Sequence, residues 1–322
     1  MTSRTITITT GARLHCGLLA LGDGQQRQFG GVGLMIDRPG VSLRVTAFER
    51  DEVSADEMDR ARVVEIVRQY RSRCPAGVPP PPCRIELLSS IPSHVGLGSG
   101  TQLAMAVAKG LSLFAGESDP TAAELADRVG RGKRSAIGLH GFVTGGLLVD
   151  GGKQRDDEIS PIIARVDMPG DWRFVLVRPP AEIGCSGSSE LGAFATLPPI
   201  PDRTTERLCR LIVLELLPSV QHRDFAGFAL SLREFNHTVG QHFSSVQGGV
   251  VASRRMTELA AWLEQRGVVG VGQTSWGPTM FAACSSPEEA DLWLRQIGAD
   301  WSDCRVELVR PMNQGAHCRT SV

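Results

Sequence analysis

Alternating apolar and polar positions predict the strands of this chain. Residues 5–9 read Thr-Ile-Thr-Ile-Thr and residues 41–45 repeat the alternation, which is typical of strands with one buried face. We expect further strands at 84–88, 142–149, 172–177, 268–271, 279–283 and 304–309. The stretch between the first two strands is rich in glycine, and we expect its residues 12–17 and 28–33 to form a loop that lines a pocket.

Helical spacing of apolar residues predicts the segments between these strands. The expected helices span 57–71, 99–114, 121–129, 204–217, 223–245, 253–266 and 287–297. Strands and helices alternate along most of the chain, and this order predicts an α+β sandwich. Pro179 and Pro180 interrupt the pattern near its middle, and we place a domain boundary in this neighbourhood, between residues 1–170 and 171–322.

A glycine-rich loop ahead of the expected helix 99–114 predicts an anion site. Residues 92–102 read Pro-Ser-His-Val-Gly-Leu-Gly-Ser-Gly-Thr-Gln and follow an expected strand. Glycines let the backbone approach an anion, and the N–H groups and dipole of a first helical turn attract negative charge. The spacing is neither that of a Walker loop nor that of a dinucleotide fingerprint. The alternative is a tight turn capped by Ser99.

A second glycine-rich segment joins two of the expected strands in the C-terminal half. Residues 270–279 read Gly-Val-Gly-Gln-Thr-Ser-Trp-Gly-Pro-Thr. This segment is a second candidate wall for an anionic pocket. The alternative is an ordinary hairpin turn, because Gly-Pro also occurs in simple turns.

Composition narrows the class of protein. With 322 residues, 42% of them hydrophobic and 21% charged, the chain can build a substantial core and is long enough for two domains. The formal net charge of −1 argues against nucleic acid and anionic membrane as partners and favours a small molecule. No signal sequence or apolar run of bilayer length is visible, so we expect a cytoplasmic protein. The eight cysteines are scattered without zinc-site spacing, and we expect them to be reduced and structural.

Three motifs together resemble those of the GHMP kinase superfamily. They are Arg13-Leu14-His15, Pro-x-x-x-Gly-Leu-Gly-Ser-Gly-Thr at 92–101, and Gly-x-Gly-Gln-Thr-Ser-Trp-Gly-Pro-Thr at 270–279. Within the superfamily the details are most similar to the β-ribofuranosylaminobenzene 5′-phosphate synthases, including the segment 131–141. The resemblance implies a two-domain α+β fold. Its N-terminal domain would be like domain 2 of ribosomal protein S5, and its C-terminal domain a ferredoxin-like α/β sandwich.

One departure from the kinases of this superfamily concerns their catalytic base. Many of them carry Ser-Gly-x-Asp ahead of a glycine pair, and the aspartate can serve as base for the accepting hydroxyl group. Residues 135–138 here read Ser-Ala-Ile-Gly, so Gly138 stands where the aspartate would. This weakens the kinase interpretation, for which another carboxylate such as that of Glu234 would have to act as base.

The resemblance implies a decarboxylating transfer. Phosphoribosyl pyrophosphate is joined to the ring of 4-aminobenzoate or 4-hydroxybenzoate, with release of CO₂ and pyrophosphate, on the route to tetrahydromethanopterin-type cofactors. Donors and cations must stabilise the departing pyrophosphate. Loss of CO₂ restores the aromatic ring without a strong base at that step, which fits the missing aspartate. Mg²⁺ is the expected cofactor, held mainly by the substrate, and the family suggests a homodimer.

Candidate site residues follow from these motifs. Arg13, His15 and His140 are the candidate catalytic residues, and the alternative is a surface arginine and two hydrogen-bonded structural histidines. The candidate phosphate- or substrate-binding residues are His94, Gly96, Gly98, Ser99, Gly100, Thr101, Gln102, Lys133, Arg134, Ser135, Gly272, Gln273, Thr274, Ser275 and Gly277. A metal or ring contact on the expected helix 223–245 would come from Glu234, Asn236, His237 or Gln241. The remaining alternatives are an ATP-dependent kinase and a ligand-binding protein without turnover.

Overall fold

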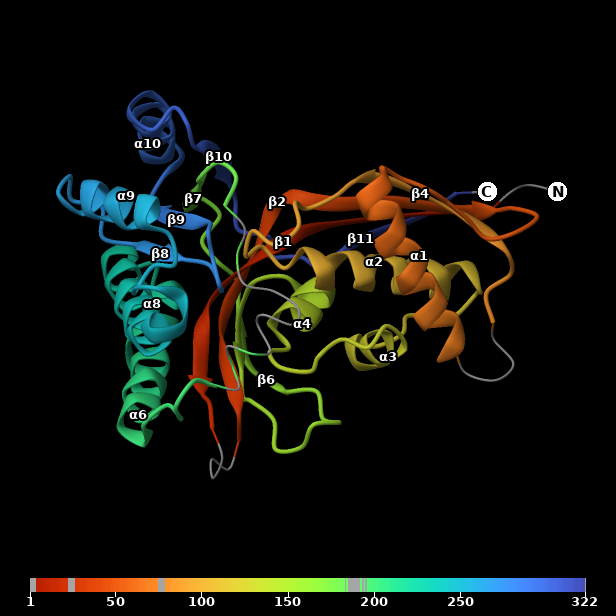
Figure 1. Cartoon of the computed structure of the whole chain (residues 1–322), viewed down its shortest axis with the longest axis horizontal. Helices are drawn as coiled ribbons and strands as arrows, with labels where there is room; N and C mark the ends of the chain where they lie inside the picture. Colours follow the sequence, from red (N-terminus) through yellow and green to blue (C-terminus); the bar gives the residue numbers. More distant parts are fainter. Residues whose placement is uncertain are drawn as a thin grey trace.

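The structure is a computed structural model that describes residues 4–22, 27–74, 79–182, 184, 192, 194 and 196–321. These residues form two sheets with their helices, arranged as two parts on either side of one long hairpin (Figure 1). The mixture of helices and strands confirms the predicted α+β class. No helix in the described part is long and apolar enough to cross a bilayer. The seven cysteines in that part are free thiols, and Cys185 lies outside it.

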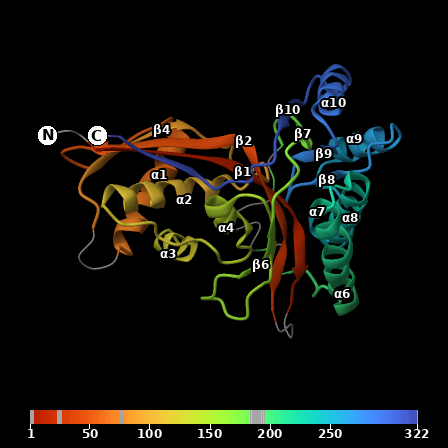
Figure 2. The ribbon, with the colours of Figure 1, turned by 180° about the vertical axis from the view of Figure 1, so that it is seen from behind.

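The first sheet is built around that hairpin, which consists of strands β1 (Thr5–Ala20) and β2 (Phe29–Ala47). Its other strands are β3 (Glu52–Ser54), β4 (Cys83–Ser89), β5 (Leu147–Asp150), β6 (Ile162–Val166) and β11 (His317–Ser321), in the order β11-β1-β2-β4-β3 with β5 and β6 beyond the far half of β2. Residues 42–47 of β2 pair with β4, whereas residues 31–34 pair with β5. The half of the hairpin that pairs with β4 therefore lies in the N-terminal part, and its other half runs between the two parts of the molecule (Figure 2).

The prediction that residues 12–17 and 28–33 form a loop is wrong, although four residues of the first segment line a pocket, as predicted. Residues 12–17 lie in β1 and residues 29–33 in β2, and a bulge between His15 and Gly17 takes up the irregularity. Gly17 has φ +144°, and a Cβ at Gly31 would lie 2.3 Å from the Gly17 carbonyl oxygen. The glycines therefore allow two strands to approach closely, and they do not interrupt them.

The helices of the N-terminal half pack on one face of the first sheet. They are α1 (Glu57–Ser72), α2 (Ser99–Phe114), α3 (Ala122–Arg128) and α4 (Ile137–Thr144). Helix α2 has the predicted bounds, and twelve of its sixteen residues are buried because it is apolar on almost every side. The predicted strand at 142–149 is partly wrong, since residues 142–144 end α4. Gly145 and Gly146, with φ of +63° and +87°, terminate that helix before β5 begins.

The second sheet has the order β10-β7-β9-β8 and is antiparallel throughout. Its strands are β7 (Arg173–Arg178), β8 (Val271–Gln273), β9 (Met280–Cys284) and β10 (Arg305–Val309). The helices of this half are α6 (Asp202–Leu211), a π-helical stretch at Ile212–Leu216, α7 (Leu217–Gln221), α8 (Phe225–Gln247), α9 (Arg254–Glu264) and α10 (Pro287–Asp300). Phe174 and Leu176 pack with residues of α8, whereas Val175 and Val177 pack with those of α9 and α10. Alternation along β7 therefore places one helical layer on each face.

Strand β11 was missed by the sequence analysis, which placed the last strand at 304–309. Residues 317–321 are all exposed and carry no apolar alternation, so only their backbone pairing with β1 defines the strand. This pairing brings the two ends of the chain together, as both views show (Figures 1 and 2). It also carries the end of the chain back to the first sheet. The domain boundary near residue 170 stays a prediction.

Candidate active site

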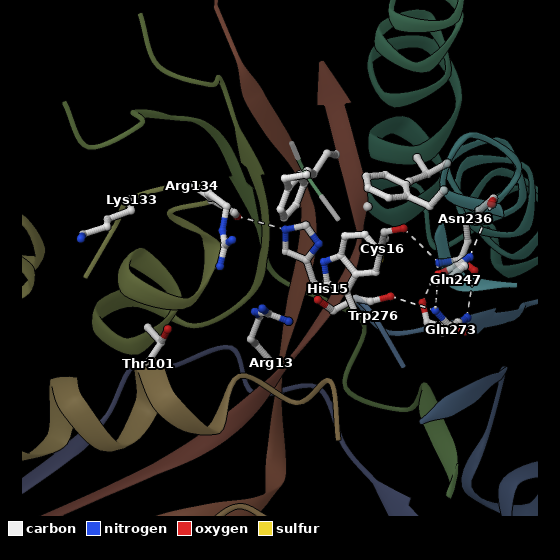
Figure 3. Close-up of a pocket in the computed structure, with 18 of the residues that line it drawn as sticks. Arg13, His15, Cys16, Thr101, Lys133, Arg134, Asn236, Gln247, Gln273 and Trp276 are labelled. Carbon is white, nitrogen blue, oxygen red and sulfur yellow. Dashed lines mark hydrogen bonds between the residues drawn. The ribbon is translucent and has the colours of Figure 1, made fainter. Parts of the chain in front are cut away.

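A pocket of about 240 Å³ lies at the meeting of the two parts of the molecule. Its walls come from β1, the first turn of α2, the loop 130–135, α8, and the loop between β8 and β9 (Figure 3). Eight of the predicted site residues line it: Arg13, His15, Thr101, Lys133, Arg134, Ser135, Gln273 and Ser275. The fold thus brings residues from all three sequence motifs to one cavity.

The hydroxyl group of Thr274 joins these three motifs. It accepts a hydrogen bond from the N–H of His15 and donates one to the carbonyl of Gly96, each at 2.9 Å. Thr274 is completely buried, and the neighbouring Ser275 N–H donates to the His15 carbonyl at 2.8 Å. A Cβ at Gly96 would lie 2.4 Å from the Thr274 carbonyl oxygen, so the two glycine-rich loops touch at a position that admits no side chain.

One end of the pocket is positively charged. Arg13, Arg131, Lys133 and Arg134 line it, and none of its described lining residues is an aspartate or glutamate. A Cβ at Gly100 would lie 3.4 Å from the Arg131 guanidinium, which places that cation beside the first turn of α2. Desolvation by the surrounding cleft and the charge of Arg62 lower the pKa of Arg131, although the side chain is still exposed to solvent. An anion bound at this end would compensate its positive charge.

The start of α2 contributes to the same end. Its N-cap is Gly98, in the left-handed region with φ 76°, and no side chain caps the first turn. The alternative of a turn capped by Ser99 is therefore wrong, because Ser99 is already the first helical residue. An uncapped first turn with its positive dipole end suits an anion.

The other end of the pocket is aromatic. Phe194, Phe243 and Trp276 contact one another edge to face, with ring centroids 4.9 to 6.1 Å apart. Val239 lines the same side one helical turn before Phe243 on α8. The sequence analysis missed these residues, and the i, i+4 spacing of Val239 and Phe243 was the one signal available. An aromatic wall of this kind is suited to a flat apolar ring.

His15 is buried inside the pocket, with 5% of its surface exposed. Its Nε2 lies 3.0 Å from the hydroxyl oxygen of Ser135. Burial lowers the pKa of His15 well below its usual value, and the charge of Arg13 acts in the same direction. The imidazole is therefore neutral at neutral pH.

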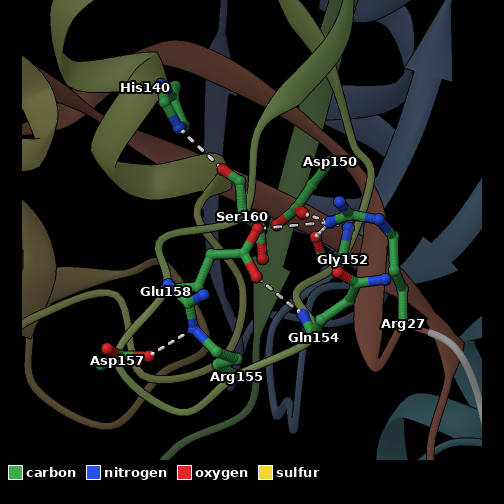
Figure 4. A network of polar contacts seen from close by, with 9 residues as sticks. All are labelled: Arg27, His140, Asp150, Gly152, Gln154, Arg155, Asp157, Glu158 and Ser160. Atoms are coloured by element: carbon green, nitrogen blue, oxygen red, sulfur yellow. Dashed lines mark hydrogen bonds and ion pairs between the residues drawn. The ribbon is translucent and has the colours of Figure 1, made fainter.

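The other two predicted histidines do not reach the pocket lining. His140 lies on α4 with Nε2 3.0 Å from the carbonyl of Ser160, in a network that holds the loop after β5 (Figure 4). In that network Arg27 donates to the Gly152 carbonyl at 2.8 Å and ties the β1–β2 hairpin to the loop. His94 is exposed, with φ 60°. The structure therefore gives His140 a supporting position away from the pocket.

The remaining predicted positions shape the walls without lining the pocket. They are Gly96, Gly98, Ser99, Gly100, Gln102, Gly272, Thr274 and Gly277. Gln102, for example, is fully buried, accepts from the hydroxyl of Thr10 at 3.1 Å and donates to the Gly138 carbonyl at 2.8 Å. A Cβ at Gly138 would lie 3.2 Å from the Thr101 methyl group, so a side chain there would project toward the first turn of α2.

Amide side chains fix the wall on the side of α8. Asn236 donates to the carbonyls of Cys16 and Gln273 at 3.0 and 2.7 Å, and accepts from the Gln273 N–H at 2.8 Å. The Gln273 side chain accepts from the Ala252 N–H at 2.7 Å and donates to the Ser275 carbonyl at 2.9 Å. Both residues line the pocket, yet their hydrogen bonds connect its walls to one another.

The other candidates on α8 lie outside the pocket. Glu234 pairs with Arg207 at 2.6 Å, and His237 and Gln241 are exposed and contact each other at 2.9 Å. Glu234 is therefore not placed to act as a base in this cavity. No group of three histidine, cysteine, aspartate or glutamate side chains that could hold a metal ion occurs within the described ranges. The expectation of Mg²⁺ held mainly by the substrate stays a prediction.

The fold and the motifs define the class of protein. Residues 61–146 match the GHMP kinases N terminal domain, and residues 216–303 match the GHMP kinases C terminal family. Homoserine kinase from Cytophaga hutchinsonii has a similar structure, with a TM-score of 0.69 and 15% identity over 99% of this chain and 98% of that one. Mevalonate diphosphate decarboxylase from Staphylococcus aureus is also similar, with a TM-score of 0.67 and 13% identity over 99% of this chain and 98% of that one. The chain belongs to the GHMP kinase superfamily and has its two-domain fold, as the motifs predicted.

Within this superfamily the chain is similar to proteins named β-ribofuranosylphenol 5′-phosphate synthase. One from Archaeoglobus fulgidus is 29% identical over 324 residues, covering 96% of this chain and 98% of the relative. Another from Methanothermobacter thermautotrophicus is 28% identical over 297 residues, covering 86% and 88%. The relatives confirm the predicted kinship with these synthases, and with it an enzyme of the pentosyltransferase type.

The Thr274 junction predicts the effect of an isosteric substitution. Thr274→Val keeps the shape of the side chain but leaves the buried His15 N–H without its acceptor, so we expect the free energy of unfolding to fall by about 2 kcal/mol. Thr274→Ser keeps the hydroxyl and should cost about 1 kcal/mol or less, for the lost methyl group. Urea denaturation of the three proteins measures both values. Equal losses for valine and serine would show that the hydroxyl is not what matters.

The cationic end predicts a second effect, on anion binding. Arg131→Met removes a cation beside the first turn of α2, and we expect the affinity for inorganic pyrophosphate to fall about ten- to one-hundred-fold, the range for losing charge-assisted hydrogen bonds. Titration calorimetry measures this affinity. Arg254→Met on α9, where 95% of the side chain is exposed, is the matched control and should leave the affinity unchanged. Equal affinities for both variants would place the anion elsewhere.

Proposed function

We propose that this enzyme transfers the phosphoribosyl group of phosphoribosyl pyrophosphate to the ring of 4-hydroxybenzoate, with release of CO₂ and pyrophosphate. The observation that carries the proposal is the pairing of a cationic end and an aromatic end in one pocket. A highly charged phosphate donor and a flat aryl acceptor need just these two environments next to each other. The name of the relatives, which specifies a ribosylated phenol, supports the hydroxy acid as acceptor.

The phosphate groups would lie against the cationic end. Arg131 and Lys133 extend from the loop 130–135, and the uncapped first turn of α2 faces the same region. Breaking the bond between the sugar and pyrophosphate leaves an oxocarbenium-like ribose, so stabilising the departing charge is the main catalytic demand. Lys133 lines the pocket and is exposed, so its ammonium group can approach a bound anion. Mg²⁺ bound to the pyrophosphate would share this charge and travel with the substrate.

The aryl ring would lie against Phe194, Phe243 and Trp276. Arg134 is placed between the two ends, because its guanidinium stacks over the Phe194 ring at 5.0 Å and it also lines the cationic side. This arrangement would bring the ring carbon that carries the carboxylate next to the anomeric carbon of the sugar. Bond formation followed by loss of CO₂ then restores the aromatic ring, so no proton has to be removed from the attacking carbon.

A kinase reaction is less well supported by the site. Many kinases of this superfamily use an aspartate as base for the accepting hydroxyl of their substrate. Gly138 offers no side chain, Glu234 is paired with Arg207 outside the pocket, and no described lining residue carries a carboxylate.

The deciding experiment follows the carboxyl carbon. Purified protein is incubated with Mg²⁺, phosphoribosyl pyrophosphate and carboxyl-labelled 4-hydroxybenzoate, without ATP, and released CO₂ is counted. Release that depends on both substrates supports the proposal, and a parallel reaction with 4-aminobenzoate ranks the two acceptors. ADP formation from ATP and candidate alcohols, without CO₂ release, would return the protein to the kinases. Binding of phosphoribosyl pyrophosphate without any turnover would make it a ligand-binding member.

The aromatic wall predicts a selective effect on the acceptor. Phe243→Ala removes one face of the expected ring site, and we expect the KM for 4-hydroxybenzoate to rise about ten- to one-hundred-fold, while that for phosphoribosyl pyrophosphate changes less than about two-fold. Steady-state kinetics with each substrate varied in turn provide both constants. Leu230→Ala on the same helix, where 58% of the residue is exposed, is the control for a general disturbance of α8. A rise in both constants for Phe243→Ala would argue against a separate ring site.

A further inference from the structure

A buried carboxylate behind the pocket has no role in the function proposed above. Asp150, the last residue of β5, is 0% exposed. Its Oδ1 accepts the N–H of Gly152 at 2.9 Å (Figure 4). Its Oδ2 accepts the N–H of Ala136 at 2.7 Å. Burial raises the pKa of Asp150, and the two backbone N–H groups act in the opposite direction. Hydrogen bonds to its two oxygens from Ala136, Gly152 and Ser135 favour the ionised carboxylate.

Ser135 connects this carboxylate to the pocket. Its hydroxyl donates to Asp150 Oδ2 at 3.3 Å, and the hydroxyl oxygen accepts the N–H of Ile137 at 3.3 Å. The same oxygen lies 3.0 Å from Nε2 of His15. A hydroxyl group has one hydrogen and two lone pairs. With its hydrogen directed to Asp150, Ser135 can only accept from His15, which places the ring proton on Nε2 and leaves the lone pair on Nδ1.

The free nitrogen of His15 belongs to the pocket. Since Nε2 points to Ser135, next to Arg134, Nδ1 lies on the opposite edge of the imidazole, and Figure 3 shows Trp276 on that side. The other charged or titratable groups that line the cavity are Arg13, Cys16, Arg131, Lys133 and Arg134. Burial and the charge of Arg13 disfavour the imidazolium form, whereas a carboxylate at Asp150, connected through Ser135, would favour it. His15 therefore presents a neutral nitrogen acceptor beside the proposed ring site.

We propose that Nδ1 of His15 takes the proton of the acceptor's 4-hydroxyl group and that Asp150 is a positioning residue acting through Ser135. The proposal rests on the proposed function and assigns a base to it. The O–H electron pair becomes the carbonyl π bond, and ring electrons form the bond from the carboxylate-bearing carbon to the anomeric carbon as pyrophosphate leaves with its bonding pair. The bond to the carboxylate then breaks, CO₂ departs, its electron pair restores the ring, and the imidazolium returns the proton to the phenolate oxygen. No proton is gained or lost overall.

This role depends on the acceptor. An amino group at the same position donates its lone pair to the ring without first losing a proton, whereas a neutral hydroxyl group is a much weaker donor than its anion. Removing the base should therefore slow the reaction of 4-hydroxybenzoate much more than that of 4-aminobenzoate. A ring fluorine next to the hydroxyl makes the phenol more acidic and reduces the need for a base.

The test compares acceptors across variants. His15→Gln should lower kcat for 4-hydroxybenzoate about one-hundred-fold, a typical contribution of a positioned base, lower it less than about ten-fold for 4-aminobenzoate, and retain more activity on 3-fluoro-4-hydroxybenzoate. Asp150→Asn should lower kcat for the hydroxy acid and shift the acidic limb of its pH profile to lower pH, because the loss of the negative charge makes His15 a weaker base. The KM for phosphoribosyl pyrophosphate should not change. Ser135→Ala, which leaves both backbone bonds of Asp150 in place, should reproduce the effect of Asp150→Asn if the latter protein folds poorly.

The outcomes separate the two levels of the proposal. Equal losses with both acceptors, or an acidic limb that does not move in Asp150→Asn and Ser135→Ala, would overturn the role of His15 as base while leaving the synthase in place. A wild-type enzyme that releases no CO₂ with any of the acceptors would overturn the proposed function itself. A hydroxy-specific loss together with the shifted limb is the result that supports the proposal.

Discussion

The pocket depends on one buried hydroxyl group. Thr274 accepts from the His15 N–H and donates to the Gly96 carbonyl, so a single atom joins strand β1 and the two glycine-rich loops. These segments lie more than 80 residues apart along the chain and belong to both halves of the molecule. In a fully buried place each polar group must find a partner, because an unmet N–H or carbonyl is costly. Together with the backbone hydrogen bond from Ser275 to His15, the hydroxyl therefore holds the register in which the halves meet.

Two glycines, which have no side chain, are as important for the pocket as this hydrogen bond. Gly96 lies against the Thr274 backbone, and Gly17 allows Val239 of α8 to approach β1, since a Cβ there would lie 2.7 Å from a Val239 methyl group. Close approach at these two points brings the cationic loop 130–135 and the aromatic side of α8 within one cavity. One end of the cavity is cationic because the short basic loop 130–135 lies beside the uncapped start of α2. The other end is apolar because an apolar face of α8 lines it. The pocket thus keeps a cationic surface apart from an aromatic one, and no group of three metal-binding side chains occurs in the described part of the chain.

Much of the local structure could be predicted from the sequence. Helix α2, the strand before it and the glycine-rich loop between them were recognisable from periodicity and from the position of the glycines. Local signals failed where tertiary pairing decided the conformation. The glycine-rich parts of β1 and β2 became strands because they pair with each other, and β11 formed from a polar, exposed segment because the edge of β1 was available.

For the site, the sequence alone determined which motifs belong together, and their order along the chain was enough to predict the superfamily and the cationic residues Arg13, Lys133 and Arg134. It could not assign a role to each histidine, because identical side chains at 15, 94 and 140 differ only in what surrounds them. The tertiary structure buried His15 beside Ser135, left His94 exposed and turned His140 toward the Ser160 carbonyl. It also placed Arg131 and Phe243 in the pocket lining and Asp150 behind Ser135, and each of these positions depends on neighbours distant in the sequence. Local patterns specify segments, whereas charge compensation, burial and hydrogen-bond partners arise between segments and are decided by the fold.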